Sequence, residues 1–141
     1  MKVYKRILVA NDGSPGGLKA LTAALAIARS NDAELHMITV EELPRFPATI
    51  DEIDEEKTEA NHRLAPVIAA ARADAVAAGV RIEVHLLPGH VAEAVVGLIN
   101  ERAIDLLVVG FMGHSALYQR IIGGTTDRLV RLAPCAVLVV K

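Results

Sequence analysis

The sequence predicts an α/β protein built on an open parallel sheet that is covered by helices on both faces. Three short apolar runs, at 7–10, 106–109 and 136–140, do not alternate with polar residues, which is typical of strands buried on both faces. Segments with helical spacing separate the strand-like segments, so the order along the chain is β-α-β-α-β-α-β-α-β. This alternation favours parallel strands joined by right-handed crossovers.

Two further strand-like segments, at 35–39 and 82–86, alternate between apolar and polar residues. Alternation indicates a strand with one wetter face, so we place both segments nearer an edge of the sheet. On this interpretation the side chains of His36 and His85 point outward and lie at the surface.

Four helices are expected between the strands. Ser14 followed by Pro15 predicts an N-cap and a proline in the first helical position. Gly79 and Pro134 are suited to ending two of the later helices. The acidic, proline-containing stretch 41–56 predicts a solvated loop that leads into the second helix, with a lid or a partner-binding loop as the alternative. The three helices after the first are expected at about 51–78, 91–102 and 125–132.

The composition excludes several classes of function. Apolar residues make up 52% of the 141 residues, enough for a packed core, so we expect a single domain over 1–141. The net charge of −2 gives no basic surface for nucleic acid, and an aromatic content of 3% leaves little to stack on bases. No apolar run approaches the ~20 residues of a membrane span. The start of the chain lacks the features of a signal peptide, and Cys135 is the single cysteine, so we expect a cytoplasmic protein.

Ligands of open α/β sheets bind beyond the carboxyl ends of the strands, so the residues that follow each strand are candidates for a site. Asp12 follows the first strand, where a carboxylate can accept hydrogen bonds from a ribose or hold a metal ion through water. Its alternative role is an Asp-Gly turn before the Ser14 cap, and the two roles are compatible.

Two pairs of glycines predict a phosphate site at the same edge of the sheet. One pair follows the fourth strand, where the missing Cβ atoms let the backbone approach a ligand. The other pair leads into the last helix, whose first N–H groups attract anions, and two threonines there add hydroxyl donors. The alternative is that these glycines serve only as turns and caps. In order, the residues are Gly110 and Gly113, Gly123 and Gly124, and Thr125 and Thr126.

Several common motifs are missing from the sequence. It contains no G-x-x-x-x-G-K-[ST], G-x-G-x-x-G or G-x-S-x-G motif. A phosphorylated receiver domain would need an Asp at the end of the third strand, where this chain has Leu87-Pro88-Gly89. None of the five histidines forms a ligand pair at metal spacing. We find no positioned general base or nucleophile, and therefore expect at most slow hydrolysis of a bound ligand rather than an efficient enzyme.

Five segments of the chain carry a specific combination of residues. They are Arg6 to Ser14, Ala33 to Val40, Pro88-Gly89-His90, Asp105 to Gly110, and Arg131 to Val140. Together they resemble the universal stress protein family over essentially the whole chain. The resemblance implies a Rossmann-like fold, akin to the adenine nucleotide α-hydrolases, with the strand order 3-2-1-4-5.

The nucleotide-binding branch of that family carries the motif G-x2-G-x9-G-[ST], and Gly110, Gly113 and Gly123 match it at the same spacing. The resemblance implies that the chain binds ATP, with Mg²⁺ as a candidate companion, between the loops of the first and fourth strands and acts as a stress-response switch. Asp12 and Val40 would lie at the adenosine, and Asp12 is the candidate to hold a metal ion through water. The implied nucleotide-binding residues are Ala10, Asp12, Val40, Gly110, Met112, Gly113, Gly123, Gly124, Thr125 and Thr126.

Two positions depart from that motif. Gly124 replaces the usual Ser or Thr and lacks a hydroxyl, which is worth about 1 kcal/mol for one hydrogen bond, although Thr125 can partly substitute. Met112 stands where the family often has a basic residue, and Arg120 in the same loop can compensate. The alternative is therefore a family member that binds no nucleotide and acts as a dimeric interaction module. A nucleotide-α-hydrolysing enzyme of related topology should carry more basic residues in this loop.

The resemblance also implies a homodimer. In the strand order 3-2-1-4-5 the last strand lies at an edge, and an unbroken apolar edge invites pairing with a second copy. Antiparallel pairing of two such edges gives a closed two-fold dimer. The residues of this strand are Ala136, Val137, Leu138, Val139 and Val140.

Overall fold

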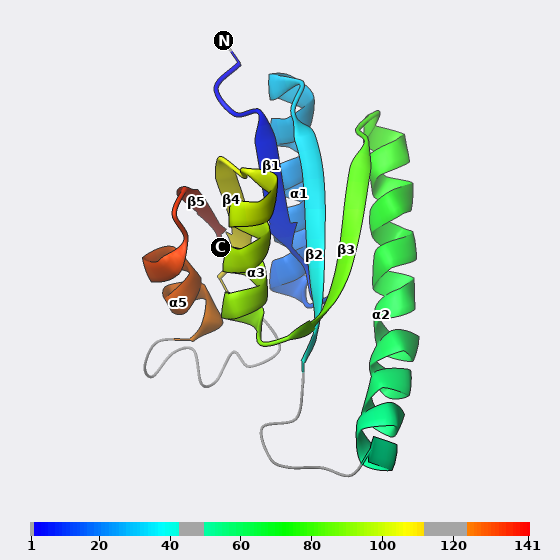
Figure 1. Cartoon of the computed structure of the whole chain (residues 1–141). Helices are drawn as coiled ribbons and strands as arrows, with labels where there is room; N and C mark the ends of the chain where they lie inside the picture. Colours follow the sequence, from blue (N-terminus) through cyan, green and yellow to red (C-terminus); the bar gives the residue numbers. More distant parts are fainter. Residues whose placement is uncertain (1, 43–49, 112–123) are drawn as a thin grey trace.

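Helices and strands alternate along the whole of the described chain. The computed structural model describes residues 2–42, 50–111 and 124–141, with the backbone alone described at 53 and 56–61. Met112, Gly113, His114, Arg120 and Gly123 lie outside the described residues. The elements are β1 (Arg6–Ala10), α1 (Pro15–Asn31), β2 (Glu34–Glu42), α2 (Ile50–Ala78), β3 (Ile82–Gly89), α3 (Val91–Arg102), β4 (Leu106–Gly110), α5 (Thr125–Leu132) and β5 (Ala136–Val140) (Figure 1).

The described strands form a five-stranded parallel sheet in the order β3-β2-β1-β4-β5. Val9 in the middle of β1 pairs with Met37 of β2 on one side and with Val108 of β4 on the other. The predicted fold class and strand order are therefore confirmed. Because all strands run the same way, their carboxyl ends meet at one edge of the sheet.

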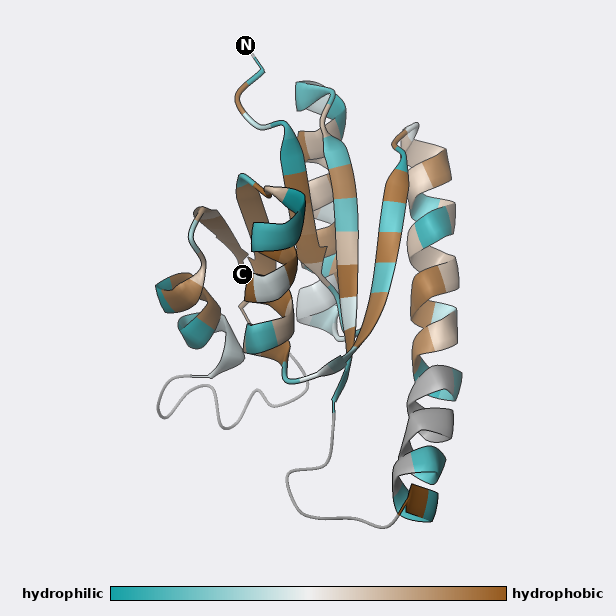
Figure 2. Cartoon of the chain, viewed as in Figure 1, coloured by the Kyte–Doolittle hydropathy of each residue, from teal (hydrophilic) through white to brown (hydrophobic). Residues whose placement is uncertain are grey.

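Helices cover both faces of the sheet. In Figure 1, α1 lies behind the strands and α3 in front of them. The core on the α1 side includes Val9, Met37 and Val108, with Ala71 of α2 packed into it. The core on the α3 side includes Leu8 and Leu107, with Leu129 of α5. Figure 2 shows apolar colouring along β4 and along β1 beyond its first residue, whereas β3 alternates in colour, as the two kinds of strand pattern predict.

The helix ends follow the local sequence. The N–H of Gly17 donates to the Ser14 hydroxyl oxygen at 3.1 Å, so Ser14 caps α1 as predicted. Gly79 has a φ of +70°, a conformation that favours glycine, directly after α2. The second helix carries Pro66 inside it, which removes one backbone donor. The second helix, α2, begins at Ile50, close to the expected start at about 51, and β2 continues to Glu42, so both ends of the acidic stretch 41–56 belong to regular elements.

The predicted surface position of His36 is wrong. The His36 side chain is only 5% exposed and that of His85 only 11%, and their rings stack with centroids 5.3 Å apart. The alternating pattern correctly separates the two faces of β2 and β3, but the polar face is covered by α3. Which face a helix covers depends on long-range packing, and alternation alone does not report it.

The described residues include no helix that is both long enough and apolar enough to cross a bilayer.

Candidate functional site

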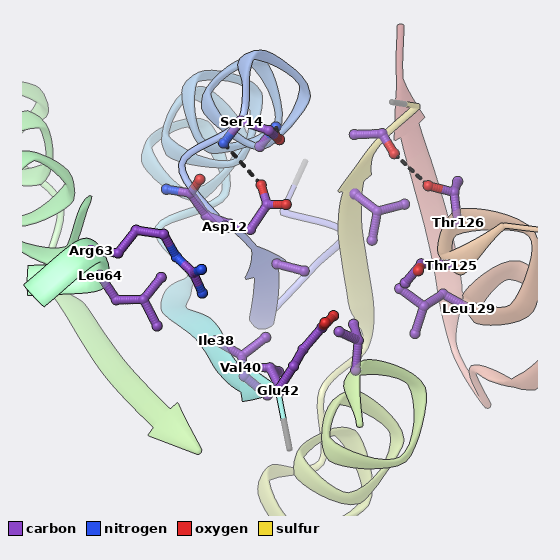
Figure 3. Close-up of a pocket in the computed structure, with 16 residues that line it drawn as sticks. Asp12, Ser14, Ile38, Val40, Glu42, Arg63, Leu64, Thr125, Thr126 and Leu129 are labelled. Atoms are coloured by element: carbon purple, nitrogen blue, oxygen red, sulfur yellow. Dashed lines mark hydrogen bonds between the residues drawn. The ribbon is translucent and has the colours of Figure 1, made fainter. Parts of the chain in front are cut away.

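A pocket lies at the carboxyl edge of the sheet, between the ends of β1, β2 and β4 and the start of α5. Its volume is about 320 Å³, within the range of small-molecule sites. Figure 3 shows Asp12 and Ser14 on one side, with Thr125 and Leu129 across from them. The described lining residues are Ala10, Asn11, Asp12, Ser14, Gly17, Ile38, Val40, Glu42, Arg63, Leu64, Val91, Val109, Gly110, Thr125, Thr126 and Leu129. We call this the strand-end pocket.

The turn after β1 forms the first wall of the pocket. The side chain of Asn11 accepts a hydrogen bond from the N–H of Gly13 at 3.0 Å, and that of Asp12 accepts one from the N–H of Ser14 at 2.9 Å. Gly13 has a φ of +82°, so this turn depends on glycine. The predicted Asp-Gly turn and Ser14 cap are both present. They hold the Asp12 carboxylate at the pocket, because its backbone partner fixes the side chain in place.

The fourth strand and the last helix form the opposite wall. The hydroxyl of Thr126 donates to the backbone carbonyl of Gly110 at 2.7 Å (Figure 3). Gly124 occupies the N-cap position of α5 and provides no side-chain capping hydrogen bond. The first N–H groups of α5 therefore lie beside the pocket without a capping side chain from that residue.

The structure brings most of the predicted nucleotide-binding residues to one place. Gly124 directly precedes α5, whose first two residues line the pocket. Met112, Gly113 and Gly123 lie outside the described residues. The expected residues that line the pocket are Ala10, Asp12, Val40, Gly110, Thr125 and Thr126.

Ten of the sixteen described lining residues were not among the predicted site residues, and Glu42, Arg63 and Leu64 are three of them. Glu42 belongs to the end of β2, and Arg63 and Leu64 belong to α2, whose first half extends beyond the carboxyl ends of the strands (Figure 1). Figure 3 shows Arg63 reaching from α2 into the pocket. Among the described lining residues, Arg63 carries the only positive charge. A residue in mid-helix lacks any local signal for a ligand site, so only the path of α2 past the sheet reveals it.

The structure also brings together a polar cluster that we did not predict. The ligand atoms of His36, Glu83 and His85 all lie within 4.8 Å of one another. The expectation that no histidines pair at metal spacing considered spacing along the chain, whereas His36 and His85 come together through pairing between strands.

The chain is an open α/β protein with a pocket where the strand order reverses, between β1 and β4, which is the place where ligands of this class of fold bind. The model of the universal stress protein family matches residues 3–141. Universal stress protein MJ0531 from Methanocaldococcus jannaschii is 32% identical over 148 residues, which cover 99% of this chain and 83% of that protein. The chain belongs to the universal stress protein family.

Solved structures agree with this assignment. The universal stress protein UspA from Lactobacillus plantarum superposes with a TM-score of 0.85 at 24% identity and shows the same fold over 98% of both chains. A universal stress protein crystallised in complex with cAMP is 29% identical, with a TM-score of 0.78, and the match covers 98% of this chain and 97% of that one.

Proposed function

We propose that the chain binds an adenine nucleotide, ATP, in the strand-end pocket and acts as a stress-response switch. The observation that carries the proposal is the composition of the pocket: aliphatic side chains form one part, and hydroxyls and a helix start form another. The cAMP complex of a 29% identical relative supports an adenine ligand in this family. We further propose that residues 1–141 act as one domain, located in the cytoplasm.

The aliphatic part of the pocket suits the adenosine. Ala10, Ile38 and Val40 come from β1 and β2 and offer apolar surface, and Asp12 lies beside them as an acceptor for ribose hydroxyls. Since the chain has few aromatic residues, we expect adenine to be held by aliphatic contacts and backbone hydrogen bonds rather than by ring stacking.

The start of α5 suits the phosphates. Its N–H groups attract anions, and Gly124 leaves room beside them. Because the Thr126 hydroxyl already donates its hydrogen bond to the Gly110 carbonyl, we assign to Thr125 the role of hydroxyl donor to the phosphates. Arg63 adds a positive charge from α2. We also propose Met112, Gly113 and Gly123 as residues of the same phosphate-binding site.

Magnesium would accompany ATP at Asp12. A carboxylate is the usual protein ligand of Mg²⁺, directly or through water, and the side chain of Asp12 is held by the N–H of Ser14. The ion would supply charge neutralisation for the phosphates. We propose binding with at most slow ATP hydrolysis.

Isothermal titration of the metal-free protein with ATP, AMP and cAMP, with and without Mg²⁺, tests the proposal. We expect saturable heat with ATP and a higher unfolding temperature, since a ligand that binds only the folded chain stabilises it. No heat and no thermal shift at millimolar ATP would overturn it.

A matched pair of arginine variants locates the ligand. Arg63→Gln removes the charge from the pocket and should weaken ATP binding roughly tenfold, or about 1.4 kcal/mol. Arg72→Gln removes the same charge from an exposed position further along α2 and should leave the affinity unchanged. Equal affinities for both variants would place the phosphates elsewhere.

A dimeric interaction module is the second candidate function. The specific observation in its favour is the edge strand β5, where Leu138 is exposed, together with the missing hydroxyl at Gly124. We propose that the homodimer forms through β5, from Ala136 to Val140, whichever function holds. Dimerisation without any nucleotide binding would favour this second candidate.

A further inference from the structure

Three side chains from β2 and β3 meet on the α3 side of the sheet, outside the strand-end pocket. His36 Nδ1 lies 3.0 Å from His85 Nε2 and 3.4 Å from Glu83 Oε2. His85 Nε2 lies 3.8 Å from Glu83 Oε1. Two imidazole nitrogens and one carboxylate therefore converge within a few ångströms.

The strand register produces this convergence. His36 pairs with Glu83, and Ile38 pairs with His85, in the parallel ladder between β2 and β3. Glu83 and His85 are two residues apart, so their side chains point to the same face of β3. Neighbouring side chains on one face of adjacent strands are close enough to share a ligand.

The distances suit one bound cation. Two nitrogens at Zn–N distances of 2.0–2.1 Å in a tetrahedral site lie about 3.3 Å apart, close to the separation of the His36 and His85 nitrogens. Imidazole nitrogens favour Zn²⁺ and its first-row neighbours, whereas Mg²⁺ and Ca²⁺ prefer oxygen ligands. Two histidines and one carboxylate make three protein ligands and leave a fourth position for water.

The burial of the cluster keeps both rings available as ligands. The His36 side chain is 5% exposed, and burial lowers the pKa of both histidines, with Glu83 opposing that effect. A neutral imidazole has one nitrogen without a proton, which is the form that binds a metal ion. The ion would replace the hydrogen bond between the two rings: the ring that donates it would move its proton to its other nitrogen, and the other ring already carries its proton there.

The charged groups around the cluster permit a cation. Arg102 of α3 lies 3.4 Å from Glu83 Oε1 and 3.9 Å from Glu101 Oε1, so it can keep Glu101 as a partner when Glu83 turns to a metal ion. The negative charge of Glu34 also acts to raise the pKa of His36, and Glu34 is itself paired with Arg6. Carboxylates thus face the cluster from β2, β3 and α3.

We propose that His36, Glu83 and His85 form a zinc site that joins the edge strand β3 to β2. The site is independent of the nucleotide proposal, since none of the three residues lines the strand-end pocket. Backbone hydrogen bonds already join β2 and β3. Bound zinc would add a cross-link between them and so stabilise the sheet at its β3 edge.

Metal titration of the untagged, EDTA-treated full chain tests the site. We expect one Zn²⁺ per chain at micromolar concentration, a higher unfolding temperature, and the visible absorption of tetrahedral Co²⁺ when cobalt replaces zinc. No binding of Zn²⁺ and no cobalt spectrum would overturn the proposal and leave the cluster as a hydrogen-bonded network.

Matched variants assign the ligands. Glu83→Gln and His85→Gln should each weaken Zn²⁺ binding roughly tenfold or more. Glu93→Gln and His90→Gln are the controls, because both residues are exposed and Glu93 has a similar arginine partner, Arg128, at 3.3 Å. Because Glu83 is half exposed, its variant should fold normally. Unchanged affinity in Glu83→Gln and His85→Gln would overturn the assignment.

Removing the positive charge of Arg102 on α3 should change the affinity for Zn²⁺ in the opposite direction to the ligand variants. Arg102→Gln removes a competitor for Glu83 and a positive charge, so it should bind Zn²⁺ more tightly than the natural chain. A merely structural role of the cluster would not produce tighter metal binding. Weaker binding in Arg102→Gln would contradict the proposed geometry.

Discussion

Gly110 at the end of β4 packs directly against the backbone of Gly16 in α1. A Cβ built at Gly110 would lie 2.5 Å from both the carbonyl carbon and the carbonyl oxygen of Gly16. Backbone atoms of a buried helix start cannot move aside as a flexible side chain can. The glycine of the motif therefore has a packing role in addition to the close approach to a ligand that the sequence predicted.

This contact predicts that Gly110→Ala is strongly destabilising. The added methyl group must push α1 away from β4, and overpacking of this kind costs about 1–3 kcal/mol. Urea unfolding measures the effect. Gly97→Ala is the matched control, because a Cβ there meets nothing within 4 Å and the residue is helical. That control should gain about 0.5–1 kcal/mol. Equal effects of the two substitutions would refute the packing role.

Removing the cap at the start of α1 should lower the free energy of unfolding by less than Gly110→Ala does. Ser14→Ala removes the acceptor of the Gly17 N–H and should lower the free energy of unfolding by about 1 kcal/mol. Ser30→Ala is the comparison, because its exposed hydroxyl donates back to the Ile27 carbonyl near the other end of the helix. That hydroxyl also accepts from the Asn31 amide at 3.3 Å, but the amide keeps the Ile27 carbonyl as an acceptor. Chemical denaturation should show little change for Ser30→Ala. A loss of similar size at Ser30 would mean that the cap does not matter.

The sequence predicts the fold well, because local signals and tertiary packing agree. Residues 91–102 and 125–132 form helices with the bounds that their periodicity predicts, and 136–140 forms the last strand. Ser14 and Gly79 act at helix ends as their chemistry suggests. Alternation of apolar strands with helices leaves few topologies, so the parallel sheet follows from the pattern, whereas its strand order was implied by the family resemblance.

The candidate site is predicted only where it depends on strand ends. Asp12, Val40 and Gly110 line the pocket because parallel strands bring their carboxyl ends to one edge. Arg63 also lines the pocket, but its position depends on how far α2 extends past the sheet. His36 is buried because α3 covers its face of β2. Such contacts between distant segments leave no periodic trace in the sequence.

The partly buried Cys135 should react slowly with thiol reagents. Burial raises the pKa of the Cys135 thiol, and the nearby charge of Asp105 adds to this effect, so less of the reactive thiolate is present at neutral to mildly alkaline pH. The alkylation rate by iodoacetamide should therefore be lower in the folded chain than in urea, where the shift is lost. Cys135→Ser should show no reaction. Equal rates in both states would contradict the shift.

The same shift gives a sign for the pH dependence of stability. As the pH rises, the unfolded chain loses the thiol proton first and then binds fewer protons than the folded chain. The free energy of unfolding should therefore fall as the pH rises through the thiol pKa of the unfolded chain. Cys135→Ser should remove this part of the pH profile in urea titrations.

The exposed edge of β5 makes the dimer proposal testable by one substitution. Leu138 is 37% exposed on this strand, whereas Val139 packs against the core on the α3 side, so Leu138 can be changed with less risk to the fold. In a two-fold pairing of β5 strands, Leu138→Lys would bring a positive charge close to its own copy. Light scattering should then show dimers for the natural chain and monomers for the variant.

Leu86→Lys is the control for the opposite edge of the sheet. Leu86 is 38% exposed on β3, so the substitution adds the same charge to an edge strand with the same exposure but away from β5. That variant should stay dimeric and keep the unfolding transition of the natural chain. Dimers that persist in Leu138→Lys, or that are lost only in Leu86→Lys, would exclude pairing through β5. The second result would place the interface on β3, next to the histidine cluster.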